Sequence, residues 1–99
     1  MKYKVICEVS FPSFEVTFDV NIPYNKTVYF VTQMLDRIIK ENIYPAYQGK
    51  ENAILVNQKT GMIYDKNKLI NETDIKNGTK LTYYWYVNLH KNIYKINKI

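Results

Sequence analysis

Few residues in the sequence could take part in catalysis. The chain has one cysteine, Cys7, and one histidine, His90. A reactive thiol needs exposure and a nearby cation or helix terminus, whereas Cys7 shares one face of a predicted strand with Val5 and Val9. We therefore interpret Cys7 as a core residue. No Cys, His or acidic cluster with metal-ligand spacing accompanies His90, which we interpret as a solvated tail residue.

The acidic residues and the glycines are better explained by structure than by chemistry. Glu8, Glu15 and Asp19 fall on the outward faces of predicted strands, where solvated carboxylates are ordinary. Asn77-Gly78 is typical of a turn and is not part of a Gly-rich phosphate loop. The sequence therefore predicts that the chain is not an enzyme and has no catalytic residue, cofactor or metal site.

One amphipathic helix organises the predicted fold. The stretch Thr27–Asn42 lacks Gly and Pro, and Thr27 (or Asn25) can cap its first turn. Pro45 follows and cannot continue a helix. The apolar residues recur with a helical period, which predicts one face packed against strands: Val28, Val31, Met34, Leu35, Ile38 and Ile39.

The rest of the body alternates with the period of β-strands. Strands are predicted over residues 2–9, 14–22, 53–57, 62–64 and 80–87, which gives the order β-β-α-β-β-β. We expect an α+β fold in which a mixed sheet of about five strands wraps one helix. The expected core is Val5, Cys7, Val16, Phe18, Val20, Val28, Val31, Leu35, Ile38, Ile54, Val56, Leu69, Ile75, Leu81 and Tyr83.

The composition limits the kind of partner. The 99 residues carry a net charge of +5, but residues 88–99 contribute three Lys and no acid, so the body is nearly balanced. A nucleic-acid domain usually concentrates positive charge on its folded face, so nucleic acid is not the expected partner. No apolar run reaches the roughly 20 residues of a membrane span. Neither a signal peptide nor an internal disulfide is expected, and we predict a cytoplasmic protein.

The element order and several motifs resemble ubiquitin-like β-grasp proteins. The alternating second strand ends in Ile22-Pro23, and the helix covers Val28–Ile39. The body closes with Lys68-Leu69 followed by Asp74-Ile75-Lys76-Asn77-Gly78-Thr79-Lys80-Leu81. More narrowly, the chain resembles the small YukD/EsaB-type proteins that accompany bacterial type VII secretion systems. The resemblance covers roughly residues 3–86.

The resemblance implies a non-enzymatic accessory or regulatory module that binds a protein of a type VII (ESX/Ess-like) secretion system. Such a module would reach the inner face of the membrane through its partner. Conjugation is not implied, because the chain ends Ile96-Asn97-Lys98-Ile99 rather than Gly-Gly. The start at Met1 favours a free-standing protein. The alternatives are a homodimer, a nucleic-acid-binding domain that uses sheet aromatics and tail lysines, and the soluble N-terminal domain of a larger membrane component.

The basic tail, residues 88–99, is predicted to lie outside a domain formed by residues 1–87. Leu89, Ile93 and Ile96 are spaced as on one face of a helix, and the lysines of the tail fall on the opposite face. We expect a short amphipathic helix that docks on the domain, a partner or an anionic surface. A disordered tail is the alternative, because about twelve residues are marginal for an isolated helix.

Strand alternation predicts a partner-binding face. If the helix covers Val5, Ile54 and Tyr83, the opposite face of the sheet carries their sequence neighbours in a row. Tyr is enriched at interface hot spots, which favours a protein contact there. The alternatives for this face are a dimer contact, a cover formed by the tail, and an idle surface. The hypothesised partner-binding residues are Lys4, Ile6, Leu55, Tyr84 and Tyr86.

Overall fold

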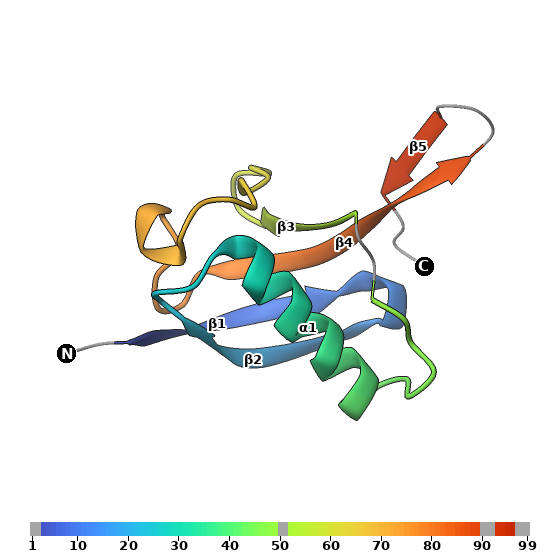
Figure 1. Ribbon diagram of the computed structural model, residues 1–99, viewed down its shortest axis with the longest axis horizontal. Coiled ribbons are helices and arrows are strands. Elements are labelled where there is room, and N and C mark those ends of the chain that lie inside the picture. Colours follow the sequence, from blue (N-terminus) through green and yellow to red (C-terminus); the bar gives the residue numbers. More distant parts are fainter. Residues whose placement is uncertain (1–2, 50–51, 90–92, 97–99) are drawn as a thin grey trace.

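The computed structural model describes residues 3–49, 52–89 and 93–96. One helix, α1 (Val28–Asn42), crosses one face of the sheet (Figure 1). Short 3-10 turns occur at Pro12–Phe14 and Ile70–Glu72. The strands are β1 (Lys4–Phe11), β2 (Val16–Pro23), β3 (Ala53–Asn57), β4 (Lys80–Leu89) and β5 (Ile93–Ile96).

Four strands form a mixed sheet in the order β2-β1-β4-β3. β1 pairs antiparallel with β2 and parallel with β4, and β4 pairs antiparallel with β3. The parallel pair is central because the chain crosses over through α1 between the first hairpin and the second half of the sheet. This α+β arrangement confirms the predicted architecture. β5 pairs with the end of β4, beyond the part of β4 that pairs with β3.

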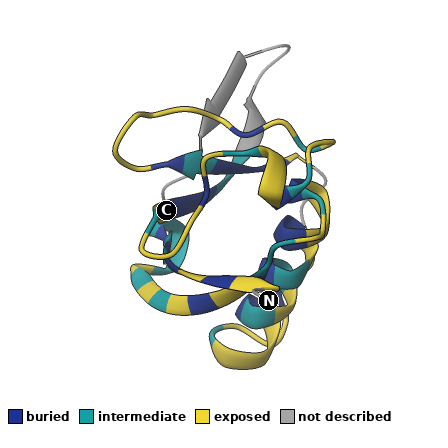
Figure 2. Cartoon of the chain, turned by 90° about the vertical axis from the view of Figure 1, so that its left-hand side faces the viewer, coloured by how far each residue is buried: buried dark blue, intermediate teal, exposed yellow. Residues whose placement is uncertain are grey.

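The helix begins and packs as its sequence predicts. Thr27 is the N-cap, and its Oγ1 accepts a hydrogen bond from the Phe30 amide at 3.0 Å. The residues of α1 that face the sheet are fully buried, and the exposed residues lie on the other side (Figure 2). At the C-terminal end Ile39 is fully buried, whereas the predicted core residue Ile38 is half-buried.

Most of the expected core is correct. Ten of its residues are buried, although Ile54 is not part of the hydrophobic core cluster: Val5, Cys7, Val20, Val28, Val31, Leu35, Ile54, Ile75, Leu81 and Tyr83. The other five are half-buried: Val16, Phe18, Ile38, Val56 and Leu69. The structure adds nine buried hydrophobic residues that the expected core lacks: Val9, Phe11, Ile22, Ile39, Tyr47, Ala53, Leu55, Tyr64 and Ile70.

One expected strand is wrong. Residues 62–64 form a single β-bridge, between Ile63 and Val56, instead of a strand. The segment follows a turn in which Gly61 has a φ of 77°, and the chain leaves β3 again after two backbone hydrogen bonds. The amide of Asn57 donates to the carbonyl of Met62 at 2.9 Å, and that of Tyr64 donates to the carbonyl of Leu55 at 3.0 Å.

The described part of the tail forms strand rather than the expected helix. β4 continues to Leu89, and β5 pairs antiparallel with it, with Tyr86 level with Ile96 and Leu89 level with Ile93. Pairing with an existing strand satisfies the backbone groups of a segment that is too short for a stable isolated helix. His90 lies outside the described residues. The boundary at residue 87 stays a prediction.

Candidate functional site

The partner-binding face expected from the sequence is wrong at β3. Leu55 is level with Tyr83 in the β3–β4 pair, so both side chains lie on the helix side of the sheet. Leu55 is fully buried in the core. Ile54 is level with Tyr84 and shares the other side of the sheet with it. The predicted orientation of β3 is therefore inverted, and Leu55 is not a surface residue.

Ile6 and Tyr84 both lie on the side of the sheet opposite α1, called here the open face, but at different ends. Ser10 is level with Thr82 in the parallel β1–β4 pair. Ile6 precedes Ser10 by four residues, and Tyr84 follows Thr82 by two, so strand geometry separates them by roughly 20 Å. They do not form the expected row. The side chain of Tyr86 lies outside the described residues.

The centre of the open face is polar. The hydroxyls of Ser10 and Thr17 are 3.1 Å apart, and the Gln58 side-chain amide donates to Ser10 Oγ at 3.0 Å. Ser10 and Gln58 border a shallow depression of about 420 Å³, which Val56 and Tyr84 also line. The expected apolar centre is therefore absent from this described surface, and its hydroxyls hydrogen-bond one another.

Ile6 stands at the edge of a different feature, the loop before β4. Its side chain is 55% exposed, and Lys4 beside it is exposed as well. The Ile6 amide donates to Asn77 Oδ1 at 2.8 Å, and the Gly78 amide donates to the Ile6 carbonyl at 2.8 Å. Gly78 adopts a φ of 87°, which favours glycine at this turn. The turn therefore joins Ile6 to the loop.

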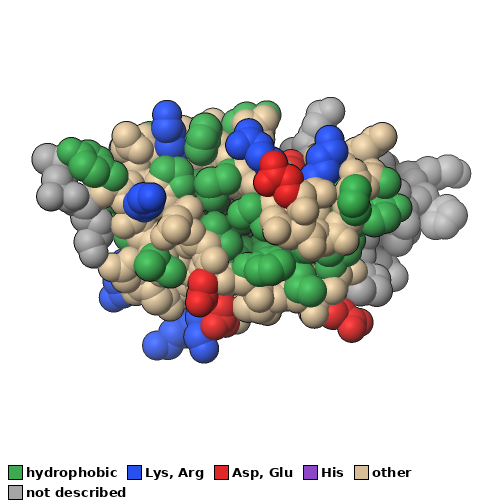
Figure 3. Space-filling model, turned by 90° about the horizontal axis from the view of Figure 1, so that it is seen from below, with side chains coloured by type: hydrophobic (Ala, Val, Ile, Leu, Met, Phe, Trp, Pro, Cys, Tyr) green, Lys and Arg blue, Asp and Glu red, His purple; other side chains and the backbone are tan. Residues whose placement is uncertain are grey.

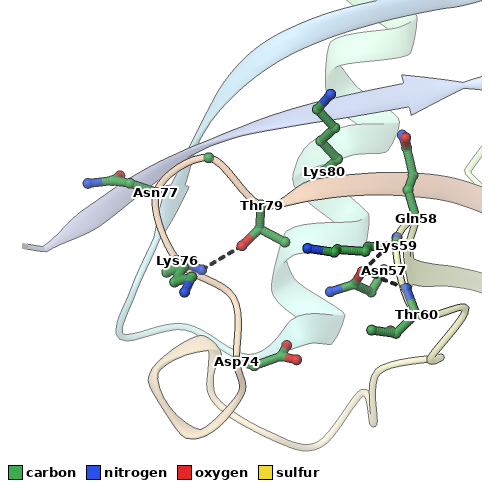
Figure 4. A pocket seen from close by; sticks show the side chains of 10 residues that line it. Asn57, Gln58, Lys59, Thr60, Asp74, Lys76, Asn77, Thr79 and Lys80 are labelled. Atoms are coloured by element: carbon green, nitrogen blue, oxygen red, sulfur yellow. Dashed lines mark hydrogen bonds between the residues drawn. The ribbon is translucent and has the colours of Figure 1, made fainter.

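That loop forms one wall of a pocket of about 730 Å³, which we call the lysine pocket. Its walls are residues 57–60, the turn after β3, and residues 74–80, the loop that leads into β4. Lys59 extends from the first wall toward Lys76 and Thr79 on the second, and Lys80 projects from the start of β4 (Figure 4). The single acidic residue that lines it is Asp74.

A chain of hydrogen bonds connects the two walls of the lysine pocket. Asn57 Oδ1 accepts from the amides of Lys59 and Thr60 at 2.9 and 3.1 Å, which fixes the first turn. Asn57 Nδ2 donates to the hydroxyl of Tyr64 at 2.9 Å, and that hydroxyl donates to Asp74 Oδ1 at 2.5 Å. Burial, followed by the bond to Asp74, raises the pKa of Tyr64 to about 12. We call these three side chains the Tyr64 relay.

Comparison with known proteins identifies the fold. No family model matches the chain, and no curated protein matches it either. A chain of the MycP5-free ESX-5 inner membrane complex is similar over 93% of this chain, with a TM-score of 0.73 and 15% identity. The ubiquitin-like domain of an Arabidopsis thaliana protein is similar over 92% of this chain and 87% of its own, with a TM-score of 0.62 and 19% identity.

A designed protein based on ubiquitin is similar over 93% of this chain and all of its own, with a TM-score of 0.64 and 13% identity. The chain has a ubiquitin-like fold. The expected fold is thus confirmed, while membership of the YukD/EsaB family stays a prediction. The matched region is 23% of the ESX-5 chain, so this ubiquitin-like chain spans about a quarter of that neighbour.

A second surface of the ubiquitin-like fold is the groove between β2 and α1. Phe18 and Val20 from the strand and Met34 and Ile38 from the helix line a hollow of about 280 Å³. Hydrophobic side chains gather in the middle of the side of the molecule that Figure 3 shows. β2 is an edge strand, and an exposed edge beside an apolar groove can receive another strand.

Three residues of β2 direct their backbone groups away from the sheet. The Tyr24 amide donates to the Tyr3 carbonyl at 2.7 Å, which marks a bonded pair at the start of the β1–β2 ladder. Because such pairs alternate along an antiparallel ladder, Thr17, Asp19 and Asn21 point outward. The charged Asp19 is central among them, and a charge at an edge discourages pairing with other strands.

Sequence reasoning missed a buried polar cluster at the other end of the sheet. Tyr47, from the connection between α1 and β3, is 4% exposed, and its hydroxyl lies 2.8 Å from that of Tyr83. The Tyr83 hydroxyl donates to Asp36 of α1. Burial raises the pKa of both tyrosines, and the nearby Asp36 raises both pKa values further. The hydrogen bonds of this cluster therefore link α1 to β4 and to the segment between α1 and β3.

The remaining candidate for chemistry is Cys7. Its side chain is fully buried, and its thiol donates to the Lys76 carbonyl at 3.4 Å. Burial raises the pKa of the thiol to about 11, so the reactive thiolate is disfavoured at neutral pH. Within the described residues, no three His, Cys, Asp or Glu side chains come together as metal ligands. No helix in that part of the chain is long and apolar enough to cross a membrane.

Proposed function

We propose that this chain is a non-enzymatic protein-binding module that serves as an accessory or regulatory component of a bacterial type VII secretion system. The observation that carries the proposal is the likeness to a chain of the ESX-5 inner membrane complex, which extends over 93% of the present chain. The fold offers an exposed edge strand and a pocket, which supports a role in binding. The module would work at the inner face of the membrane by contacting a protein that is anchored there.

The open face is the surface proposed to contact that protein. A standard interface covers about 800 Å² on each partner, a patch roughly 28 Å across. The separation of about 20 Å between Ile6 and Tyr84 fits inside such a patch. One partner can therefore contact both residues, together with Lys4, although they do not touch one another. Leu55 takes no part, because it is buried in the core.

Capture of secretion components tests this function. The tagged chain is expressed in a bacterium that has a type VII system, crosslinked and purified from the membrane fraction, and the captured proteins are identified by mass spectrometry. Ile6→Ser and Tyr84→Ser, made separately, should each reduce capture. Ile63→Ser and Tyr29→Ser are the matched controls, because these residues are 49% and 48% exposed. Capture of no secretion component by the parent would contradict the proposal.

A second candidate follows from the same neighbour. The matched region is only 23% of the ESX-5 chain, so in that protein a fold of this kind is one part of a larger component. The chain would then act as a soluble domain that is joined to a membrane-spanning portion. Sequencing the encoding DNA on both sides of the given residues separates the two candidates, because a joined domain requires an open reading frame that continues.

A further inference from the structure

The lysine pocket is lined by more cations than carboxylates. Lys59, Lys76 and Lys80 line it against the single carboxylate of Asp74. None of the three lysines forms an ion pair with a described residue. Asp74 Oδ1 is occupied as the acceptor of the Tyr64 hydroxyl. A ligand that brings several negative charges would therefore find cations without having to displace an existing ion pair.

The walls of the lysine pocket are held in place before any ligand arrives. The Tyr64 relay connects the first wall to Asp74 on the second, and its central residue is 4% exposed. Within the second wall the Lys76 amide donates to Thr79 Oγ1 at 3.0 Å, and the Thr79 amide donates to the Lys76 carbonyl at 3.0 Å. Fixed walls lower the ordering cost of binding, so modest charge interactions suffice for measurable affinity.

The residues that line the lysine pocket favour an acidic polypeptide over a nucleic acid. Single-stranded nucleic acids are usually held by aromatic side chains that stack on the bases as well as by lysines. No aromatic residue lines this pocket. Its volume of about 730 Å³ lies within the range of roughly 300–1,000 Å³ of ligand pockets. Carboxylates need only the ammonium donors that the pocket supplies.

An apolar contact adjoins the pocket at Ile6. This side chain is 55% exposed, and its backbone is bonded on both sides to the pocket loop, at Asn77 and at Gly78. We propose that the lysine pocket receives a short segment rich in Asp and Glu from the partner protein, with a neighbouring apolar residue packed against Ile6. The proposal rests on the proposed function in that the ligand is a protein segment.

Peptide binding to the whole chain tests the proposal. The probe is a fluorescein-labelled synthetic peptide rich in Glu with one Leu, and binding is followed by fluorescence anisotropy at low and at physiological salt. A peptide in which every Glu is replaced by Gln should not bind. The triple variant Lys59→Gln, Lys76→Gln and Lys80→Gln should bind the acidic peptide roughly tenfold more weakly, because three exposed charge contacts are lost. Ile6→Ser should weaken binding only of peptides that contain the Leu.

The matched control removes the same charge elsewhere. Lys26, Lys40 and Lys68 are exposed and line no part of the lysine pocket. The triple Lys→Gln variant at these positions should bind nearly as the parent does, because only the long-range field changes. Equal weakening by both triple variants would overturn the proposal in favour of non-specific attraction. So would tighter binding of a single-stranded oligonucleotide that depends on the pocket lysines.

The outcome is distinguishable from that of the proposed function. If the acidic peptide fails to bind while the parent and the pocket variant both capture secretion components, the lysine pocket is not the docking site and the proposed function stands. If the peptide binds through the pocket lysines but no secretion component is captured, the pocket assignment stands and the proposed system is wrong. Melting curves of every variant, expected to match the parent because the three lysines and Ile6 are exposed, exclude loss of the fold.

Discussion

Removing one hydroxyl tests whether the Tyr64 relay holds the lysine pocket together. Tyr64→Phe keeps the buried ring and deletes only the oxygen that accepts from Asn57 at 2.9 Å and donates to Asp74 at 2.5 Å. A bond to a carboxylate contributes about 1.5–3 kcal/mol, and the buried Asn57 amide loses its partner as well. We expect the free energy of unfolding to fall by about 2–3 kcal/mol, which lowers the melting temperature by roughly 10–20 °C in a domain of this size.

Alkaline pH gives an independent measure of the same hydroxyl. The pKa of Tyr64 rises from 10.0 to about 12 on folding, chiefly through burial. A raised folded pKa means that this stability is fully present below the unfolded pKa of about 10 and is lost as pH rises toward 12. The shift corresponds to about 2–3 kcal/mol. The parent should therefore lose more stability than Tyr64→Phe over this pH window, because both retain their other tyrosines.

Urea denaturation at neutral and alkaline pH measures both effects. Tyr29→Phe is the control, because Tyr29 is 48% exposed and its hydroxyl only accepts a bond from the Gln33 side chain at 3.1 Å. Its effect should stay below about 0.5 kcal/mol. If Tyr64→Phe and Tyr29→Phe are equally stable and show the same alkaline loss, the relay does not hold the walls of the pocket and our reasoning is refuted.

Three further predictions follow from the core, the thiol and the edge strand. Leu35→Ala should lower the free energy of unfolding by about 2–5 kcal/mol, because Leu35 is fully buried; a variant that melts like the parent would contradict the assigned helix face. Iodoacetamide should modify Cys7 at neutral pH only after denaturation, since the thiol is buried and its pKa is raised to about 11; mass spectrometry after labelling decides this, and rapid modification of the folded chain would refute it. Asp19→Val should cause concentration-dependent association through β2, measured by sedimentation, because it removes the charge from an edge beside an apolar groove; a variant that stays as dispersed as the parent would show that this charge does not guard the edge.

The helix could be predicted from the sequence and the orientation of β3 could not. The helical period lies in one uninterrupted stretch, and each apolar position of Val28, Val31 and Leu35 gives the same face. Ala53–Val56 is apolar at every position, so alternation cannot choose between its two faces. The choice is made by the register that sets Leu55 level with Tyr83, residues far apart in the chain.

The lysine pocket was hidden from sequence reasoning for a similar reason. Its two walls are separated by the segment that contains Tyr64, and the closing motif over residues 74–81 predicted the fold rather than a pocket. Tyr64 was expected in a short strand and Asp74 in the closing motif before the last strand, and only the folded chain brings their side chains to 2.5 Å. A tyrosine within a polar stretch, as at Tyr47, is a signal that could have indicated such bonds, because a tyrosine ring that packs into the core leaves a hydroxyl that needs a partner.

The charges of the lysine pocket and of the β2 edge argue that the partner is a different protein rather than a second copy of this chain. The proposed ligand of the lysine pocket is a segment rich in Asp and Glu. This chain has no such segment to offer from a second copy, because no two of its nine Asp and Glu residues are adjacent. A two-fold pairing of β2 with its copy that uses Thr17, Asp19 and Asn21 would be centred on Asp19 and would oppose two like charges directly. A partner strand with a basic residue at that position would meet no such repulsion. Both surfaces thus disfavour self-association, and they lie at different ends of the sheet. A homodimer would therefore have to form through another surface.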